Sequence, residues 1–88
     1  MNYNFTVNGW KDFEYWLEND KRYVEKIREL LKDISRDPFK GIGKPEPLKE
    51  NLKGSWSRRI TDEHRLVYHV SGKGSDQTCT IVSCRFHY

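Results

Sequence analysis

Hydrophobic and polar residues alternate at the start of the chain, and the pattern then changes to helical spacing. Tyr3, Phe5 and Val7 alternate with polar residues, as in a strand with one buried face. Between residues 10 and 17 apolar side chains recur every three or four positions. This spacing predicts a helix, and we expect Asn8 to cap its first turn.

Two predicted helices carry apolar faces that can pack into a core. Trp10 and Trp16 lie on the apolar face of the first helix, so we expect both to be core residues. Asp20 can cap a second helix, which Asp37-Pro38 should end because the residue before proline avoids helical geometry. The apolar stripe of this second helix consists of Val24, Ile27, Leu31 and Ile34.

The second half of the chain is typical of strands joined by loops. Two glycines and two prolines between Phe39 and Pro47 predict an irregular but stiff connection. Strands are predicted over Ser55–Thr61, Arg65–Val70 and Thr78–Arg85, with a flexible turn over Ser71–Gln77. This order predicts a single α+β domain spanning residues 1–88. Its N-terminal strand and two helices pack on one face of a mainly antiparallel sheet, whose other face is open.

The pairing of the two central strands decides which arginines share a face. A three-residue connection between them pairs Thr61 with Arg65 and Arg59 with Val67. Arg59 and Arg65 then lie on the open face. Arg58 has the opposite parity, so we expect it to reach the sheet edge or a surface carboxylate.

Net charge is +3, and the whole excess lies in the second half of the chain. Residues 1–43 carry eight basic and eight acidic side chains, whereas residues 44–88 carry eight basic and five acidic ones. A basic surface confined to one part of a small domain favours a polyanionic partner, most simply nucleic acid.

The sequence indicates neither a membrane segment nor a metal site. No apolar run approaches the ~20 residues of a membrane span, and the N-terminus lacks a secretory signal, so the cytoplasm is the expected compartment. Cys79 and Cys84 are an odd number of positions apart, which predicts side chains on opposite faces of one strand and no disulfide. We interpret both as small buried hydrophobes. The three histidines complete no zinc motif, so no metal or cofactor is expected.

Two kinds of candidate chemistry lie near the open face. Arg59 and Arg65 repel each other unless an anion lies between them, and no acidic residue of matching parity is near except Glu63. A phosphate fits because guanidinium groups present paired donors to its oxygens. Glu46 lies between Pro45 and Pro47, which hold the backbone rigidly, as a general base requires. The alternatives are a solvated strand face and an ordinary surface glutamate.

The last residues supply an acid and aromatic rings. His87 can hold and release a proton near neutral pH, and Tyr88 adds a phenol beside it. Phe86 is the aromatic candidate for contacting a base. The alternative is a frayed terminus. His64, in the tight connection, and His69, on the open face, are weaker candidates.

Several segments resemble one protein family. GKPEPLK, NLKGSWSRRITDEHRLVY and the ending CRFHY are similar to the YoeB (Txe) toxins, within the RelE/ParE superfamily of bacterial toxin-antitoxin systems. WKDFEYW and NDKRYVEKIRELLKD fit the same family, so the resemblance covers nearly the whole chain. It implies a RelE-like fold.

The resemblance also implies a function and roles for individual residues. It implies an endoribonuclease that cleaves messenger RNA in the A site of the 70S ribosome, is inhibited by a YefM-like antitoxin, and often forms homodimers. Glu46 would be the general base and His87 the general acid. Arg59 and Arg65 would stabilise the developing charge, Lys49 would help place the phosphate, and Tyr88 would position the nucleotide. This chemistry needs no metal.

Two other function classes remain open at the level of the sequence. A non-catalytic RNA-binding or ribosome-binding inhibitor of translation needs the basic face but neither Glu46 nor His87. A gyrase inhibitor of the ParE kind shares the fold but lacks the terminal His-Tyr.

Overall fold

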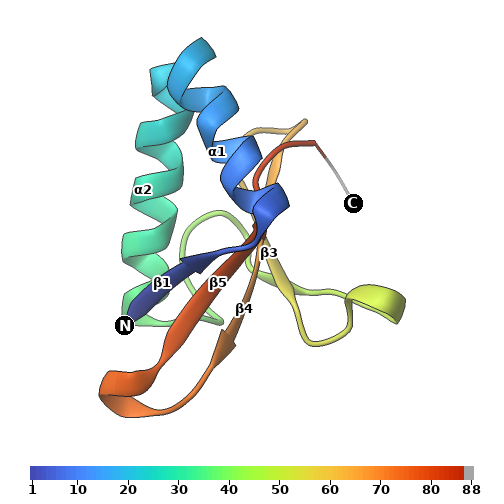
Figure 1. Ribbon diagram of the computed structural model, residues 1–88. Helices are drawn as coiled ribbons and strands as arrows, with labels where there is room; N and C mark the ends of the chain where they lie inside the picture. The colour runs from blue at the N-terminus through green and yellow to red at the C-terminus, as the bar shows by residue number, and fades with distance from the viewer. Residues whose placement is uncertain (87–88) are drawn as a thin grey trace.

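A mixed five-stranded sheet with two helices on one face makes up the computed structural model, which describes residues 1–86 (Figure 1). Its elements are β1 (Asn2–Phe5), α1 (Val7–Asn19), α2 (Lys21–Arg36), β2 (Glu46–Pro47), the 3₁₀ turn η1 (Glu50–Leu52), β3 (Trp56–Arg59), β4 (Arg65–Ser71), the 3₁₀ turn η2 (Gly74–Asp76) and β5 (Thr78–Ser83). The strand order is β1-β5-β4-β3-β2. β1 runs parallel to β5, and the other neighbouring pairs are antiparallel. This confirms the predicted α+β architecture, with β1 as an edge strand of the sheet.

A threonine, rather than the predicted Asn8, caps α1. Thr6 Oγ1 accepts a hydrogen bond from the Gly9 backbone N–H at 3.0 Å and donates one to the Val82 carbonyl at 2.9 Å. The prediction of Asn8 was wrong because this tertiary bond ties the start of the helix to β5, and Asn8 already lies inside α1. Asp20 caps α2 as predicted.

Helix α1 lies very close to the backbone of β5. A Cβ atom added at Gly9 would lie 2.2 Å from the Ile81 carbonyl oxygen, which is far inside van der Waals contact. Glycine is therefore the residue that allows the helix to approach this strand.

The core lies between the helices and the sheet, and two predicted members need correction. Trp16 is 6% exposed, but Trp10 is 45% exposed and packs its ring on Phe5 at the edge of the core. Leu30, not Leu31, is fully buried in α2. The buried cluster consists of Trp16, Val24, Ile27, Leu30, Ile34, Ile60, Leu66, Tyr68, Cys79, Ile81 and Cys84.

Cys79 and Cys84 are free thiols that lie in the same core. The predicted absence of a disulfide is confirmed. The prediction of opposite faces was wrong because β5 ends at Ser83, so strand alternation does not extend to Cys84. Burial raises the pKa of each thiol to about 12, and at Cys84 the carboxylate of Asp12 raises it as well.

The β3–β4 pairing is shifted by two residues from the predicted register. Arg59 faces Arg65, whereas the prediction placed Thr61 there. The strands separate earlier because Ile60 leaves β3 to enter the core and Thr61 closes the turn with His64, whose backbone N–H donates to Thr61 Oγ1. A shift of two keeps every side chain on its predicted face, so Arg59 and Arg65 still share the open one.

Within the described residues, neither helix is long and apolar enough to cross a membrane.

Candidate active site

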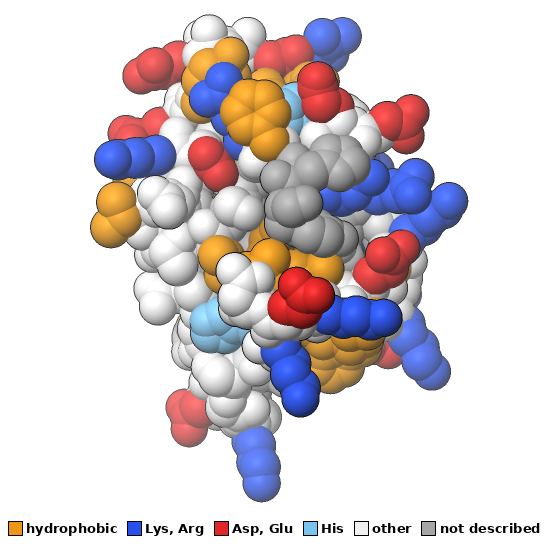
Figure 2. Space-filling view, turned by 90° about the vertical axis from the view of Figure 1, so that its right-hand side faces the viewer, with side chains coloured by type: hydrophobic (Ala, Val, Ile, Leu, Met, Phe, Trp, Pro, Cys, Tyr) orange, Lys and Arg blue, Asp and Glu red, His pale blue; other side chains and the backbone are white. Residues whose placement is uncertain are grey.

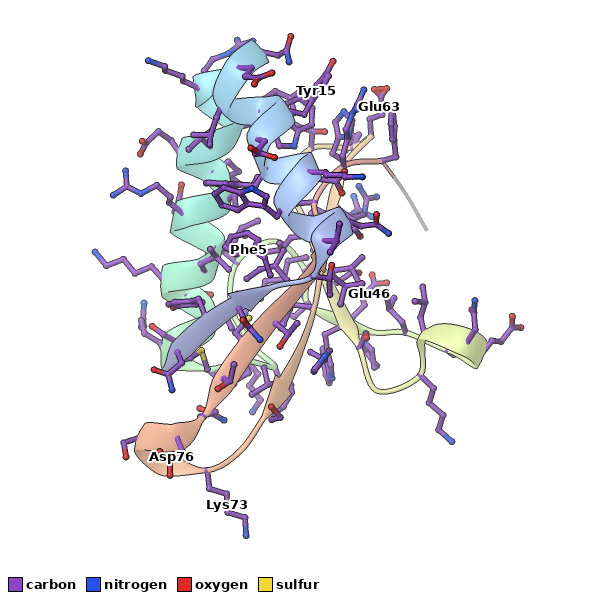
Figure 3. The ribbon with its side chains drawn as sticks, in the orientation of Figure 1. Phe5, Tyr15, Glu46, Glu63, Lys73 and Asp76 are labelled. Carbon is purple, nitrogen blue, oxygen red and sulfur yellow. The ribbon has the colours of Figure 1, made fainter. Side chains whose placement is uncertain are left out.

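Glu46 lies in the two-residue strand β2, whose placement is unusually constrained. Its neighbour in β3 is Ser57, and prolines stand on both sides of it. Lys44, two positions earlier, has a φ of 51°, a left-handed conformation that a residue with a Cβ adopts rarely. Figure 3 shows Glu46 beside β3, on the side of the sheet away from α2. The carboxylate is thus exposed on a backbone with little freedom.

The sheet register brings Glu46 and two arginines to one face. Ser57 pairs with Glu46 on one side and with Val67 on the other, and paired residues share a face. Arg59, two residues after Ser57, is therefore a diagonal neighbour of Glu46, at a typical separation of about 7–8 Å. Arg65 lies directly opposite Arg59, with Cβ atoms typically about 4.5–5.5 Å apart. The register therefore groups these three side chains as one candidate site.

Three backbone carbonyls orient Arg65. Its Nη1 donates to the carbonyl oxygens of Thr61 at 2.6 Å, Asp62 at 2.9 Å and His64 at 3.2 Å. These acceptors all belong to the β3–β4 connection, so the turn holds the guanidinium in one direction. A charged donor held in place in this way needs no reorganisation to meet an anion.

Arg59 has an acidic neighbour that the sequence argument did not predict. Its Nη1 lies 3.9 Å from Asp62 Oδ1, whereas Glu63 was the expected acidic residue. Asp62 is fully exposed and Arg59 is 42% exposed, so this contact is weak and an incoming phosphate can compete with it.

Lys49 is exposed and stands at the start of η1, where its side chain makes no capping bond. The segment from Glu46 to Leu52 encloses a hollow of about 400 Å³ on the surface, and Lys49 is part of its lining. Along the chain, Lys49 comes three residues after Glu46, just beyond the short strand β2 that carries the Glu46 carboxylate.

The chain after β5 is held by α1. The Cys84 backbone N–H donates to Asp12 Oδ2 at 2.9 Å, and Trp16 Nε1 donates to the Cys84 carbonyl at 2.8 Å. The Arg85 guanidinium lies 3.5 Å from the centre of the Tyr15 ring, a close cation–π contact. Figure 3 shows Tyr15 on the side of α1 that faces the C-terminal segment.

Phe86 is the last described residue, and two hydrogen bonds hold its backbone. Its N–H donates to His64 Nδ1 at 2.7 Å, and its carbonyl accepts from the Arg65 N–H at 3.1 Å. Its φ is 64°, which costs about 1–3 kcal/mol for a residue of this kind. Phe86 is 53% exposed, and its ring meets the His64 ring and the Arg85 guanidinium. The predicted site residues His87 and Tyr88 lie outside the described residues.

His64 is buried, which the sequence argument missed. It is 6% exposed and its ring meets Trp16, Tyr23 and Phe86 at centroid distances of 4.8, 5.6 and 5.4 Å. The sequence did contain one signal of this burial: His64 lies two residues before Leu66, so strand alternation places it on the same, buried face as Leu66.

Arg58 is also buried; of the two predicted positions the sheet edge was wrong, whereas its side chain does reach a carboxylate, the partly exposed Asp33. Its side chain is 0% exposed and crosses under the sheet to the connection that follows α2. Nη1 donates to Asp33 Oδ2 at 2.6 Å, and Nε donates to the Tyr68 hydroxyl at 3.1 Å. The remaining bonds go to the carbonyl oxygens of Asp37 (2.7 Å), Lys40 (3.0 Å) and Ile42 (3.1 Å).

This network holds the loop that leads to Glu46. Tyr68 donates its hydroxyl proton to the Pro38 carbonyl at 2.6 Å, and Asp33 Oδ2 accepts from the Ile42 N–H at 3.0 Å. The hydrogen bond from Arg58 is the main cause of a lowered pKa at Asp33. Burial raises the pKa of the Tyr68 phenol, which stays protonated as a donor. The loop has little regular structure, so these bonds fix its path.

The charged surface on this side of the molecule is mixed. Figure 2 shows lysine and arginine side chains gathered along one border, with acidic side chains among them. On this side the basic side chains therefore stand among acidic ones rather than forming a broad basic patch. Within residues 1–86 no group of three or more His, Cys, Asp or Glu side chains is placed to hold a metal ion.

The fold is that of the RelE-like toxins. The toxin-antitoxin complex RelBE2 from Mycobacterium tuberculosis contains a chain that is 23% identical to this one, and it superposes with a TM-score of 0.71 over 98% of this chain and 96% of that chain. At this identity the comparison establishes the fold class alone.

Sequence comparison narrows the class to one family. Residues 5–88 match the family described as "YoeB-like toxin of bacterial type II toxin-antitoxin system". The toxin YoeB of Escherichia coli K12 is 57% identical over 84 residues, which are 96% of this chain and 95% of that protein. The chain belongs to the YoeB-like toxins of bacterial type II toxin-antitoxin systems.

Solved structures agree with this family. A YoeB/ParE toxin from Agrobacterium tumefaciens is 53% identical and superposes with a TM-score of 0.96 over the whole of both chains. A YoeB dimer and a YoeB–YefM complex from Staphylococcus aureus are 49% and 48% identical, with TM-scores of 0.89 and 0.88, and each comparison covers 100% of this chain and 98% of that chain.

Proposed function

We propose that this toxin is a ribosome-dependent endoribonuclease that cleaves messenger RNA in the A site by acid–base catalysis. The observation that carries the proposal is the placement of Glu46, Arg59 and Arg65 on the sheet face opposite the helices, with the Arg65 N–H bound to Phe86, the residue before His87.

The reaction is an attack within the RNA on its own backbone. Glu46 takes the proton from a ribose 2′-hydroxyl, whose oxygen then bonds to the adjacent phosphorus. The bond from phosphorus to the 5′-oxygen breaks, and His87 supplies the proton to that leaving oxygen. The products are a 2′,3′-cyclic phosphate and a 5′-hydroxyl. Arg59 and Arg65 stabilise the negative charge that develops on the phosphate oxygens.

Three further residues complete the proposed site. Lys49 helps to place the phosphate from the segment after β2. Tyr88 positions the nucleotide at the scissile bond, and the exposed ring of Phe86 offers a stacking surface for a base. None of these groups needs a metal or cofactor in this reaction scheme.

A shallow face of this size supports the role of the ribosome. The site lies on a sheet surface, its cations are few, and the carboxylate of Asp62 partly screens Arg59. Binding of free RNA is therefore expected to be weak and poorly oriented. An A site that already holds the codon in a fixed geometry removes the entropy cost of orienting it.

Glu46→Gln in a translation reaction tests the proposal, with Glu50→Gln as the matched control. Both glutamates are exposed and lie in the same segment, but only Glu46 pairs with β3. Primer extension on a translated message should show cleavage ends for the wild type and for Glu50→Gln. Glu46→Gln should reduce cleavage at least about 100-fold, the usual contribution of a general base.

Other outcomes separate the rival functions. If the wild type produces no cleavage ends and Glu46→Gln still arrests translation fully, the toxin is a non-catalytic ribosome binder. Inhibition of DNA supercoiling without RNA cleavage would indicate a gyrase poison. Equal loss in both glutamine variants would remove Glu46 from the mechanism.

The S. aureus structures suggest the partners of this chain. Because a relative that is 48% identical forms a complex with YefM, we expect a YefM-like antitoxin to bind and inhibit this toxin. A related dimer supports a homodimer for this chain too. Light scattering of the toxin, alone and after co-expression with a YefM-like antitoxin, tests both expectations.

A further inference from the structure

We propose that His64 is a positioning residue for the C-terminal segment, and that its unprotonated Nδ1 fixes the backbone of Phe86. The functional part of this inference rests on the proposed function, because its consequence is the fixed start of the segment that carries His87 and Tyr88. The bond itself, 2.7 Å from the Phe86 nitrogen to Nδ1, is independent of that function.

An imidazole can accept this hydrogen bond in one protonation state only. Nδ1 accepts from a backbone N–H when it carries no proton, which places the ring proton on Nε2. Nε2 lies 3.6 Å from Glu63 Oε2, and that carboxylate favours a proton on this nitrogen. Figure 3 shows Glu63 at the same end of the molecule as Tyr15 and the C-terminal segment.

The surroundings of His64 keep the ring in this orientation. Trp16 from α1 and Tyr23 from α2 meet the imidazole edge-on, at interplanar angles of 80° and 76°. The charged group facing it from its own connection is Glu63, and the Arg65 guanidinium binds the His64 carbonyl rather than its ring. The ring is thus held on three sides, with Nδ1 directed at the tail.

The tail needs this anchor because its backbone is strained. Phe86 adopts a φ of 64°, and a bulky side chain disfavours that conformation. The bonds to His64 and to the Arg65 N–H hold the two backbone groups of Phe86 on either side of its Cα atom. Loss of the Nδ1 acceptor leaves a part-buried N–H without this partner and allows the backbone to relax to negative φ. The backbone of Phe86 would then no longer be fixed in its present conformation.

The bond can be observed in the wild-type protein without any substitution. In uniformly ¹⁵N-labelled toxin, a scalar coupling across the hydrogen bond should connect the Phe86 amide nitrogen to His64 Nδ1 at neutral pH. Acidification that protonates Nδ1 should abolish the coupling, since both nitrogens then carry protons. Absence of the coupling at neutral pH overturns the proposal.

Two substitutions at His64 separate the acceptor from the ring. His64→Asn places an amide oxygen near the position of Nδ1 and keeps an acceptor, whereas His64→Leu keeps apolar bulk and removes it. Misplacement of a catalytic group by about 1 Å can lower a rate about 100-fold, so His64→Leu should reduce cleavage on the ribosome by about that factor. His64→Asn should retain most of it. His69→Leu is the control: it should leave the chemical shift of the Phe86 amide unchanged, whereas His64→Leu should move it.

The outcomes are distinguishable from a failure of the proposed function. Equal losses in folded His64→Leu and His64→Asn, or full activity of folded His64→Leu, overturn the positioning role. If His64→Leu does not fold, the proposal is tested by the scalar coupling in the wild type and by the cleavage activity of His64→Asn. A missing coupling or a lost activity in folded His64→Asn overturns it. If wild-type toxin cleaves no message, the proposed function fails. The scalar coupling between the Phe86 amide nitrogen and His64 Nδ1 then still tests whether His64 fixes the backbone of Phe86.

Discussion

Asp33→Ala should destabilise the protein strongly, because it removes the counter-ion of a buried arginine. Arg58 is 0% exposed, and Asp33, whose side chain is 14% exposed, lies 2.6 Å from its Nη1. Breaking a buried pair costs about 3–5 kcal/mol. Water can reach the Asp33 side of this pair, and Nη1 keeps the Ile42 carbonyl as an acceptor, so we expect the low end, about 3 kcal/mol.

Thermal and urea unfolding of the wild type, Asp33→Ala and the control Glu25→Ala measure this loss of stability. A loss of about 3 kcal/mol lowers the Tm of a domain of this size by about 12–24 °C. Glu25→Ala is the control, since Glu25 lies in the same helix and pairs with Arg28 at 3.0 Å, but both side chains are about two-thirds exposed. It should change stability by less than about 1 kcal/mol. If both variants melt within about 4 °C of the wild type, the network does not have the role described.

The same carboxylate predicts how stability depends on acid. The pKa of Asp33 is lower in the folded protein than the ordinary value of 3.8, mainly because of the bond from Arg58. Its contribution is fully present above 3.8 and is lost as the pH falls through the folded-state pKa. The gap in unfolding free energy between wild type and Asp33→Asn should stay constant from neutral pH to about 5 and shrink below it. A gap that grows in acid contradicts this reasoning.

Three further predictions concern the helix start and the cysteines. Thr6→Ala should cost about 1–2 kcal/mol in urea unfolding, as loss of a cap does, whereas Asn8→Ala should stay within about 0.5 kcal/mol of the wild type. Gly9→Ala should destabilise by about 1–3 kcal/mol despite its better helix propensity, because the added methyl group meets a strand backbone; a gain in Tm would contradict this. With thiol pKa values of about 12, Cys79 and Cys84 should resist iodoacetamide in the native protein at pH near 8 and react only after denaturant is added. Rapid native labelling would show that the thiols are accessible.

Alternation and helical spacing were sufficient to predict both helices, the strands other than β2, and the shared face of Arg59 and Arg65. They missed β2, which lies within the predicted irregular connection, and they placed Val7 in the first strand, whereas it begins α1 and is 72% exposed. The placement of Arg59 and Arg65 together survived an error of two residues in the register, because side chains repeat with a period of two. Alternation failed at Cys84, one residue after β5 ends. Strand ends depend on what the next residues contact, and local patterns do not contain that information.

Contacts between distant parts of the chain could not be predicted from local patterns. Asn8 is a good cap by residue type, but Thr6 also binds a carbonyl in β5, 76 positions away. Arg58 was assigned the correct face and the wrong environment, since its partner Asp33 is 25 positions earlier. Its other acceptors are carbonyl groups of an irregular loop. The partner of His64 is a backbone group 22 positions later.

The two halves of the candidate site depend on one hairpin, through two residues that both lie on its helix-facing side. Arg58 in β3 faces the helices and fixes the loop that delivers Glu46, whereas His64 in the connection to β4 holds the tail that continues to His87. Arg65 lies between them, with its side chain bound to the same connection and its backbone N–H bound to the tail. The loop that leads to the proposed base and the backbone of Phe86, which precedes the proposed acid, are therefore both held by this hairpin. Because the two anchors have no residue in common, a change at Arg58 and a change at His64 should affect the site independently.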